Sequence, residues 1–214
     1  MYVPRSFAET DVTRLHALMQ SHSFATLVSD SPDGPVASHL PLLLEPDRGP
    51  HGALIGHFAR ANNHWQSADG RATLAIFHGP HAYISPRWYA EPRVVPTWNY
   101  VAVHATGVLR VIDDAGWLRG LVSRMVDVYE AGAVAADPGH APWRMESQPD
   151  DFLDQLLAGI VGFEIRVDSL EGKWKLSQNH TETRRERVIA ALQQSGDADS
   201  SAIAALIQAT LSGG

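Results

Sequence analysis

Polar residues that could bind a phosphate group follow the apolar segment ALIGHF, residues 53–58. Five of them come directly after this segment: Arg60, Asn62, Asn63, His64 and Trp65. A phosphate dianion is bound by guanidinium groups, by side-chain amides and by free N–H groups at the start of a helix. Residues 59–68 offer all three, because they predict a loop that runs from a strand into a short helix. We therefore expect an anion site here.

Two further segments carry polar side chains that could join this site. The segment VASHLPLL contributes Ser38 and His39. The segment KWKLSQN contributes five residues: Lys173, Lys175, Ser177, Gln178 and Asn179. Together with Arg60, these groups could supply a phosphate clamp and polar contacts to the edge of a ligand.

Another segment, VPTWNYVAVHATG at residues 95–107, places Trp98, Asn99 and Tyr100 side by side after a proline. Two interpretations are open. The rings form the wall of a pocket for a flat ligand, or they are core aromatics that face a sheet, as large aromatics in strands usually are.

Several common kinds of active site are absent from the sequence. There is no cysteine, which excludes disulfides, thiolate metal ligands and cysteine nucleophiles. The G-x-S-x-G motif of serine hydrolases and the usual glycine-rich nucleotide loops do not occur. The chain has 11 histidines, but the H-E-x-x-H spacing is missing and the acidic residues fall mainly in helices and turns. The sequence therefore predicts no metal site, and it identifies no catalytic acid or base.

The elements that must position these residues alternate in a way that predicts an α+β fold. Strand patterns dominate the middle of the chain, and helical patterns flank them, which is typical of a mostly antiparallel sheet or a small barrel. The proline-rich segment 80–97 predicts a long irregular connection with one extended piece at 82–85. The expected strands are 24–29, 35–44, 53–58, 72–79 and 98–112, followed by a last strand and turn over 160–174. The turn DSPDG predicts that the first two strands form a hairpin. The expected helices are 12–22, with Thr10 or Asp11 as its N-cap, 115–132, 150–160 and a helical end over 181–211, where SGDA joins two helices.

Composition places limits on the class of protein. The chain has 214 residues, 44% of them hydrophobic and 19% charged, which suits one globular domain. The absence of a signal peptide pattern, of a long apolar run and of cysteine favours a cytoplasmic protein without a membrane span. The formal net charge of −7 does not favour direct contact with DNA. The one dense basic segment, TRRERV at 183–188, is typical of a solvated helix face.

Six blocks in order resemble the PaiB family of FMN-binding negative transcriptional regulators. The blocks are MYVPRSF, SHLPLLL, GHFARANNHW, FHGPHAYISPRWY, VPTWNYVAVHATG and KWKLSQN. The resemblance runs from residue 1 to about residue 190. It implies a split β-barrel of the flavin-reductase and pyridoxamine-phosphate-oxidase type, FMN as cofactor, and a homodimer with the flavin at the subunit interface.

The resemblance also implies roles for individual residues. Ser38, His39 and Leu40 would meet the flavin ring or the ribityl chain. His57, Arg60 and Asn62 would hold the phosphate and the ribityl end. The remaining cofactor contacts, in the pocket or across the dimer, would be Trp98, Asn99, Tyr100, Lys175 and Gln178. Asn63 stands where the family would have proline, and it could cap the following helix instead.

Residues 1–180 are expected to form the FMN-binding split-barrel domain, and residues 181–214 a C-terminal helical extension packed on it. The family suggests a negative transcriptional regulator or a flavin-dependent sensor. Two alternatives stay open: a flavin-dependent oxidoreductase that uses NAD(P)H on a small molecule, and a binding module without turnover.

Overall fold

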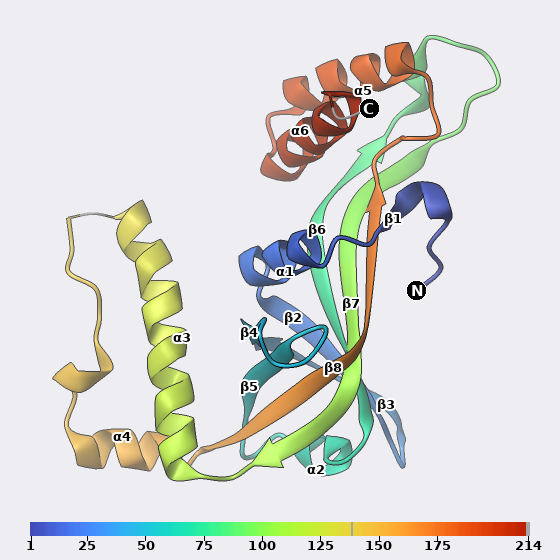
Figure 1. Ribbon diagram of the computed structural model, residues 1–214. Coiled ribbons are helices and arrows are strands. Elements are labelled where there is room, and N and C mark those ends of the chain that lie inside the picture. The colour runs from blue at the N-terminus through green and yellow to red at the C-terminus, as the bar shows by residue number, and fades with distance from the viewer. Residues whose placement is uncertain (138, 213–214) are drawn as a thin grey trace. The chain divides into compact units, whose positions relative to one another are not determined.

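The computed structural model describes residues 1–137 and 139–212, and it shows an α+β fold built on an antiparallel sheet (Figure 1). Pro138 and residues 213–214, the last two of the expected helical extension, lie outside the described residues. The strands are β1 Ala8–Glu9, β2 Phe24–Ser31, β3 Gly34–Pro41, β4 Leu43–Glu45, β5 Ala53–Ala59, β6 Ala72–Ile84, β7 Thr97–Ile112 and β8 Ile160–Lys175. The helices are α1 Val12–Ser21, α2 His64–Ala68, α3 Ala115–Ala136, α4 Asp150–Leu157, α5 Glu182–Ser195 and α6 Ala198–Ser212, with 3-10 turns η1 Arg5–Phe7, η2 Pro86–Tyr89 and η3 Met145–Ser147.

The strands are hydrogen-bonded in the order β3-β2-β6-β7-β8-β5-β4, and β1 pairs with β8. The predicted hairpin is confirmed: β2 and β3 pair antiparallel, from Phe24 opposite Pro41 to Ser31 opposite Gly34. Gly34 has a φ of 110°, which a side chain would disfavour, so glycine is suited to close this turn. Strands β4 and β5 also pair antiparallel, as do β5 and β8.

The chain divides into two compact units, described here one at a time. Unit 1 comprises Met1–His22, Ile76–His104 and Leu170 onward, and unit 2 comprises Ser23–Ala75 and Ala105–Ser169. The long strands β6, β7 and β8 each contribute residues to both units.

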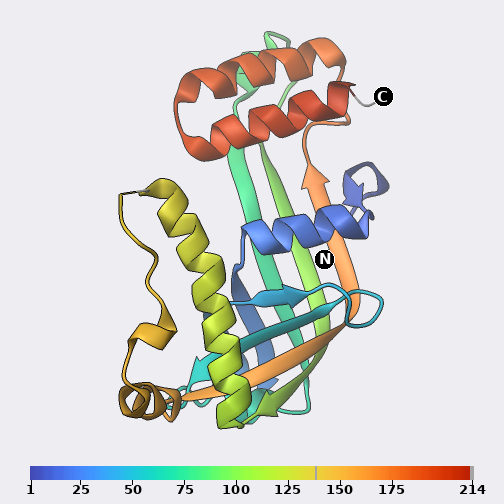
Figure 2. The same ribbon diagram turned by 60° about the vertical axis from the view of Figure 1, so that its left-hand side comes forward.

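In unit 2, helix α3 packs its apolar side on the sheet. Leu121 and Met125 are buried against Ile55 of β5, and Trp117 packs beside them. Strands β7 and β8 approach closely at Gly107, where an added Cβ would lie 2.0 Å from the carbonyl oxygen of Arg166. Both α3 and α4 belong to the chain segment that links β7 to β8, and Figure 2 shows α4 beside one end of α3.

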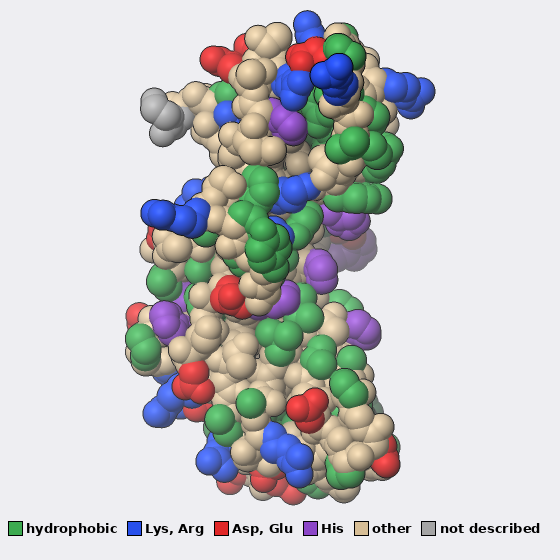
Figure 3. Space-filling view, turned by 90° about the vertical axis from the view of Figure 1, so that its right-hand side faces the viewer, with side chains coloured by type: hydrophobic (Ala, Val, Ile, Leu, Met, Phe, Trp, Pro, Cys, Tyr) green, Lys and Arg blue, Asp and Glu red, His purple; other side chains and the backbone are tan. Residues whose placement is uncertain are grey.

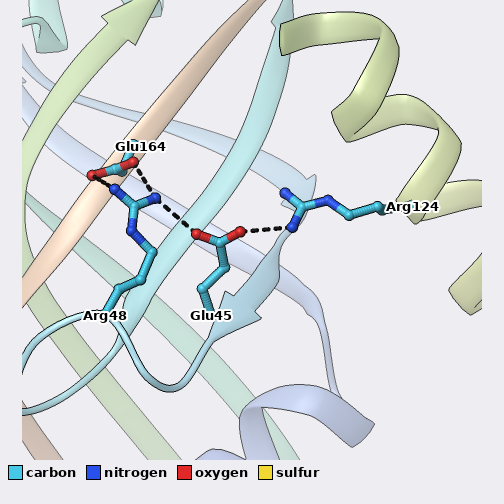
Figure 4. A network of polar contacts seen from close by, with 4 residues as sticks. All are labelled: Glu45, Arg48, Arg124 and Glu164. Carbon is cyan, nitrogen blue, oxygen red and sulfur yellow. Dashed lines mark hydrogen bonds and ion pairs between the residues drawn. The ribbon is translucent and has the colours of Figure 1, made fainter.

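A network of charged side chains also ties together three elements of unit 2 (Figure 4). Arg48 forms ion pairs with Glu45 and with Glu164 of β8, at 2.7 and 2.5 Å. Glu45 also pairs with Arg124 of α3, at 2.7 Å. Burial tends to raise the pKa of Glu45, but the hydrogen bonds from both arginines prevail and hold that pKa below its usual range. The network therefore favours the ionised carboxylate at the edge of the sheet.

In unit 1, helix α1 begins as the sequence predicts. The carboxylate of Asp11 accepts a hydrogen bond from the backbone N–H of Thr13 at 2.9 Å, which satisfies one free donor of the first turn. Leu15, Leu18 and Met19 are buried. Helices α5 and α6 pack on each other side by side, and α5 also packs against η2.

Three local expectations were wrong. Strand β6 does not end at residue 79 but continues through Pro80 to Ile84, so the irregular connection is shorter than predicted. The predicted turn at the end of the last strand is absent, because β8 continues to Lys175. Asn63 makes no side-chain cap on α2; instead, the side chain of Asn62 accepts the hydrogen bond from the N–H of His64. No helix in the described part of the chain has the length and apolar character of a membrane span.

Candidate functional site

A buried hydrogen-bond network in unit 2 joins two of the predicted cofactor residues. The side-chain amide of Asn62 donates to the Ser38 hydroxyl at 3.0 Å. The same hydroxyl lies 2.8 Å from Nδ1 of His64, and Nε2 of that imidazole lies 2.7 Å from the hydroxyl of Ser29. The structure therefore brings Ser38 and Asn62 together, as the sequence predicted, and adds His64 and Ser29 behind them.

His64 is held in one orientation by this network. It is 2% exposed, and its ring centroid lies 5.2 Å from that of Phe58. Burial lowers the pKa of the imidazole, so the ring is neutral near pH 7 and can donate through one nitrogen only. His64 was noticed in the sequence as one polar residue among several, and Ser29 was missed. The only sequence signal for Ser29 is its place on the buried side of the alternating strand β2.

Arg60, expected to clamp a phosphate, is engaged within unit 2. Its guanidinium donates two hydrogen bonds to the carboxylate of Asp113, at 3.0 and 2.6 Å, and one each to the carbonyl oxygens of Ala158 and Ile160. A guanidinium has five N–H donors, so little of this capacity is left for a ligand. A phosphate at Arg60 would compete with Asp113, whose pKa is lowered by the arginine.

The other predicted residues of unit 2 have different surroundings. His57 is partly buried in β5, which lowers its pKa, and its buried Nδ1 has no hydrogen-bond partner among the described residues. His39 is exposed; its Nδ1 lies 3.1 Å from the Thr26 hydroxyl, and its ring stacks on Phe24. Leu40 is half-buried in β3. These three residues are not part of the Ser38 network.

A second group of predicted residues meets in unit 1. The ammonium group of Lys175 donates to the Thr97 hydroxyl and to the carbonyl oxygen of Trp98. Asn99 is 1% exposed, and its amide donates to the hydroxyl of Ser177 at 2.9 Å. Burial and the charge of nearby Lys173 lower the pKa of Lys175.

The aromatic residues of segment 95–107 divide between surface and interior. Trp98 is 53% exposed and contacts Tyr83 edge to face, with the ring centroids 5.7 Å apart. Tyr100 is half-buried beneath the ammonium group of Lys173, 5.2 Å from the ring centroid. Figure 3 shows that other hydrophobic side chains also reach the surface on one face of the molecule. Trp98 is therefore available to a ligand or partner rather than being a core aromatic.

The side chain of Gln178 bonds to the backbone at the end of β8 rather than pointing to a free ligand position. Its side chain accepts from the N–H of Leu176 at 2.7 Å and donates to the carbonyl oxygen of Trp174 at 2.6 Å. It thus braces the chain after β8, next to Ser177, whose φ of 62° is unusual for a residue with a side chain.

Unit 1 also contains a pocket of about 300 Å³ beside Lys175. The residues that line it come from η1, η2, the segment after η2, the start of β7, the end of β8, the segment that follows β8, and α5. They are Phe7, Tyr89, Arg93, Val94, Val95, Thr97, Asn99, Lys175, Ser177, Asn179, His180 and Arg184. Sequence reasoning identified Asn99, Lys175, Ser177 and Asn179 as polar candidates but not the arginines or Tyr89, which lie far away along the chain.

The polar groups of Ser38, Asn62 and His57, taken as a set of hydrogen-bonding groups for a ligand, fit FMN better than a metal ion. Hydroxyl and amide groups at Ser38 and Asn62 suit the ribityl and phosphate oxygens of a flavin nucleotide. The unpaired Nδ1 of His57 is one buried polar atom that a ligand could satisfy. Within residues 1–137 and 139–212, no group of three or more His, Asp or Glu side chains could hold a metal ion.

Comparisons with known proteins agree with this donor set. Residues 1–169 match the family described as "Putative FMN-binding domain". The "Protease synthase and sporulation protein PAI 2" of Bacillus subtilis (strain 168) is 34% identical over 209 residues, which cover 97% of each chain. An uncharacterized protein of Saccharomyces cerevisiae is 34% identical over 155 residues, 61% of this chain and 90% of its own.

Two solved structures share the fold at low identity. The flavocytochrome Anf3 from Azotobacter vinelandii superposes with a TM-score of 0.61 at 12% identity, covering 86% of this chain and 78% of its own. The FAD and heme binding protein from Mycobacterium smegmatis gives a TM-score of 0.57 at 16% identity, covering 86% and 79%. At such identities the likeness concerns the fold alone.

Proposed function

We propose that this chain, which belongs to the PaiB family of FMN-binding proteins, is an FMN-dependent negative regulator of transcription or a flavin-dependent sensor. FMN is its cofactor. The proposed fold is a split β-barrel, with residues 1–180 as the FMN-binding domain and 181–214 as a helical extension. The observation that carries the cofactor site is the Ser38–Asn62–His64 network, because it fixes a hydroxyl and an amide at the start of α2.

In this proposal each residue has a defined task. Ser38, His39 and Leu40 line the ring or ribityl chain, and His57 and Asn62 contact the ribityl and phosphate end. Arg60 stays hydrogen-bonded to Asp113 and offers its one remaining N–H donor to the phosphate end. The unit 1 residues Trp98, Asn99, Tyr100, Lys175 and Gln178 complete the cofactor site in a homodimer with the flavin at the subunit interface.

FMN, when bound, supplies hydride and electron transfer at its ring. The chain's own residues bind and orient it. His64 keeps the Ser38 hydroxyl in place through a hydrogen bond of 2.8 Å. Lys175, with its ammonium group anchored on Thr97 and the carbonyl oxygen of Trp98, contributes a positive charge. A positive charge near the flavin would stabilise its anionic reduced form.

A complementation experiment tests the regulatory role. Transcripts are compared in a deletion strain that carries the wild-type gene, Ser38→Ala or Ser147→Ala, the last being an exposed serine in unit 2. An FMN-dependent regulator requires the first variant to resemble the deletion strain and the second to resemble wild type. Transcripts unchanged by the deletion itself would refute the regulatory role.

Two measurements on the purified protein separate the mechanisms. The net charge of −7 predicts no shift of DNA in a gel, so regulation would act through another protein. Rapid consumption of NAD(P)H, followed by the absorbance of the reduced nicotinamide, would favour the oxidoreductase alternative.

The mass of the FMN-loaded protein, measured by light scattering, tests the homodimer, and a monomer would contradict it.

A further inference from the structure

The unit 1 pocket is positively charged, although the chain as a whole is negative. Three cationic side chains line it, Arg93, Lys175 and Arg184, and no carboxylate does. The formal net charge of the chain is −7. In a small site with low-dielectric walls, such a local excess of positive charge attracts anions.

The hydrogen bonds of these cations leave charge available. Lys175 is bonded to a hydroxyl and a carbonyl oxygen, neither of which neutralises it. Arg184 pairs with Glu91, which offsets much of its charge, so the free charge of the pocket comes mainly from Arg93 and Lys175. No ion pair of Arg93 occurs within the described residues. Burial, then the charges of Arg184 and Lys175, lower the pKa of His180, which reports the same positive field on the pocket wall.

Backbone strain is concentrated around this pocket. Among the described residues, the non-glycine residues with positive φ are Ala90, Arg93 and Ser177, at 52°, 61° and 62°. Arg93 and Ser177 line the pocket, and Ala90 directly follows the lining residue Tyr89. Backbone strain of this kind clusters at ligand sites.

The remaining walls set the kind of ligand. Phe7, Tyr89, Val94 and Val95 give the pocket apolar and aromatic sides. Its volume of about 300 Å³ lies at the small end of the range for ligand pockets. An inorganic anion would leave the apolar walls uncovered. FMN, with three fused rings, a ribityl chain and a phosphate, is far larger than a single-ring molecule and does not suit this volume.

From the charge and the size of the pocket we propose that it binds a small aromatic carboxylate as a second ligand beside FMN. Asn99 and Lys175, which the proposed cofactor site also uses, would then lie between the two ligands. The carboxylate lies against Arg93, Lys175 and Arg184, and the ring lies between the apolar walls. This site goes beyond the proposed cofactor function and does not depend on it. In a flavin-dependent sensor or enzyme, such a ligand would be the effector or the substrate.

Calorimetric titration of the full chain with salicylate tests the site, with neutral salicylamide as the ligand control. The first variant is Arg93→Ala, which removes no hydrogen bond that the structure shows. Its matched control is Arg87→Ala, which removes an exposed arginine of the same unit that does not line the pocket. The second variant, Val95→Glu, puts a carboxylate at a residue that is 74% exposed, so folding should tolerate it.

Salicylate should bind wild type and Arg87→Ala equally. Salicylamide should bind about tenfold more weakly, because it lacks the charge that the cationic side chains attract. Arg93→Ala should weaken salicylate binding about tenfold, because it removes one of the cationic side chains. Val95→Glu should abolish salicylate binding, because the new carboxylate repels that of the ligand. FMN affinity, followed in parallel by flavin fluorescence, should be unchanged in Arg93→Ala.

Absence of salicylate binding to wild type, or equal affinities in Arg93→Ala and Arg87→Ala, would overturn this assignment. Failure of FMN to bind, with salicylate binding intact, would instead contradict the proposed function and leave the second site standing.

Discussion

Substitution of Ser29 by alanine should destabilise the protein through His64. The Ser29 hydroxyl lies 2.7 Å from Nε2 of the imidazole, and the two residues are 4% and 2% exposed. Without that hydroxyl, Nε2 is buried without a partner and water has little access to it. An unsatisfied buried polar group costs about 1–3 kcal/mol, which is the expected loss in the free energy of unfolding. For a chain of this size each kcal/mol lowers Tm by roughly 2–4 °C.

Urea unfolding at about pH 7.5, followed by circular dichroism, measures this loss under conditions where the unfolded-state histidine is also neutral. Ser147→Ala is the matched control, because that serine is exposed and its loss should change stability by less than about 0.5 kcal/mol. A double-mutant cycle of Ser29→Ala with His64→Gln should show coupling above about 0.5 kcal/mol. A loss for Ser29→Ala no larger than that of the control would refute the buried network.

Three further predictions concern stability. The buried hydroxyl of Tyr89 has no hydrogen-bond partner among the described residues. Tyr89→Phe should therefore raise the free energy of unfolding, measured by urea denaturation, by about 1 kcal/mol. A lower free energy of unfolding in this variant would mean that the hydroxyl has a partner. Burial lowers the pKa of His57 and of His64 from 6.5, so below about pH 6.5 the unfolded chain binds protons that the folded chain does not. The free energy of unfolding should therefore decrease as the pH is lowered below about 6.5 and stay constant above it. A free energy of unfolding that increases as the pH is lowered would be inconsistent with neutral histidines. Gly107→Ala should cost about 3 kcal/mol because its Cβ would overlap the Arg166 carbonyl, and an unchanged Tm would mean that β7 and β8 separate easily.

Local sequence signals predicted much of the fold. Thr10 or Asp11 was the predicted cap of the first helix, and Asp11 holds that position in the structure. The proline and glycine of DSPDG predicted the β2–β3 hairpin. The long strand expected at 98–112 begins one residue earlier, at Thr97. In these places the residues that decide the structure are neighbours in the sequence, so propensity and turn chemistry suffice.

Two local signals, at Pro80 and at Asn63, were misleading. Pro80 suggested the end of a strand because it lacks an N–H, yet β6 continues through it. Asn62, rather than Asn63, caps α2, because its amide also reaches Ser38 in a neighbouring part of the fold. At Asn62, a contact with a residue distant in the sequence therefore accompanies the change of cap.

The candidate site was predictable in part. Ser38 and Asn62 belong to recognisable blocks, and the structure brings their side chains within hydrogen-bond distance of each other. The partner of Arg60 could not be foreseen, since Asp113 lies 53 positions away. The pocket beside Lys175 is formed by segments from η1 to α5, and its charge becomes visible only when they are folded together.

The central claim is that the chain binds FMN through the Ser38–Asn62 network. The most direct measurement is the absorbance spectrum of the purified protein, with chromatography of what heat releases, for wild type, Ser38→Ala and Ser147→Ala. We predict flavin bands and released FMN from wild type and from Ser147→Ala, and a clearly lower FMN content in Ser38→Ala. A colourless wild-type protein that also fails to bind added FMN would contradict the cofactor assignment, and full FMN content in Ser38→Ala would contradict the site.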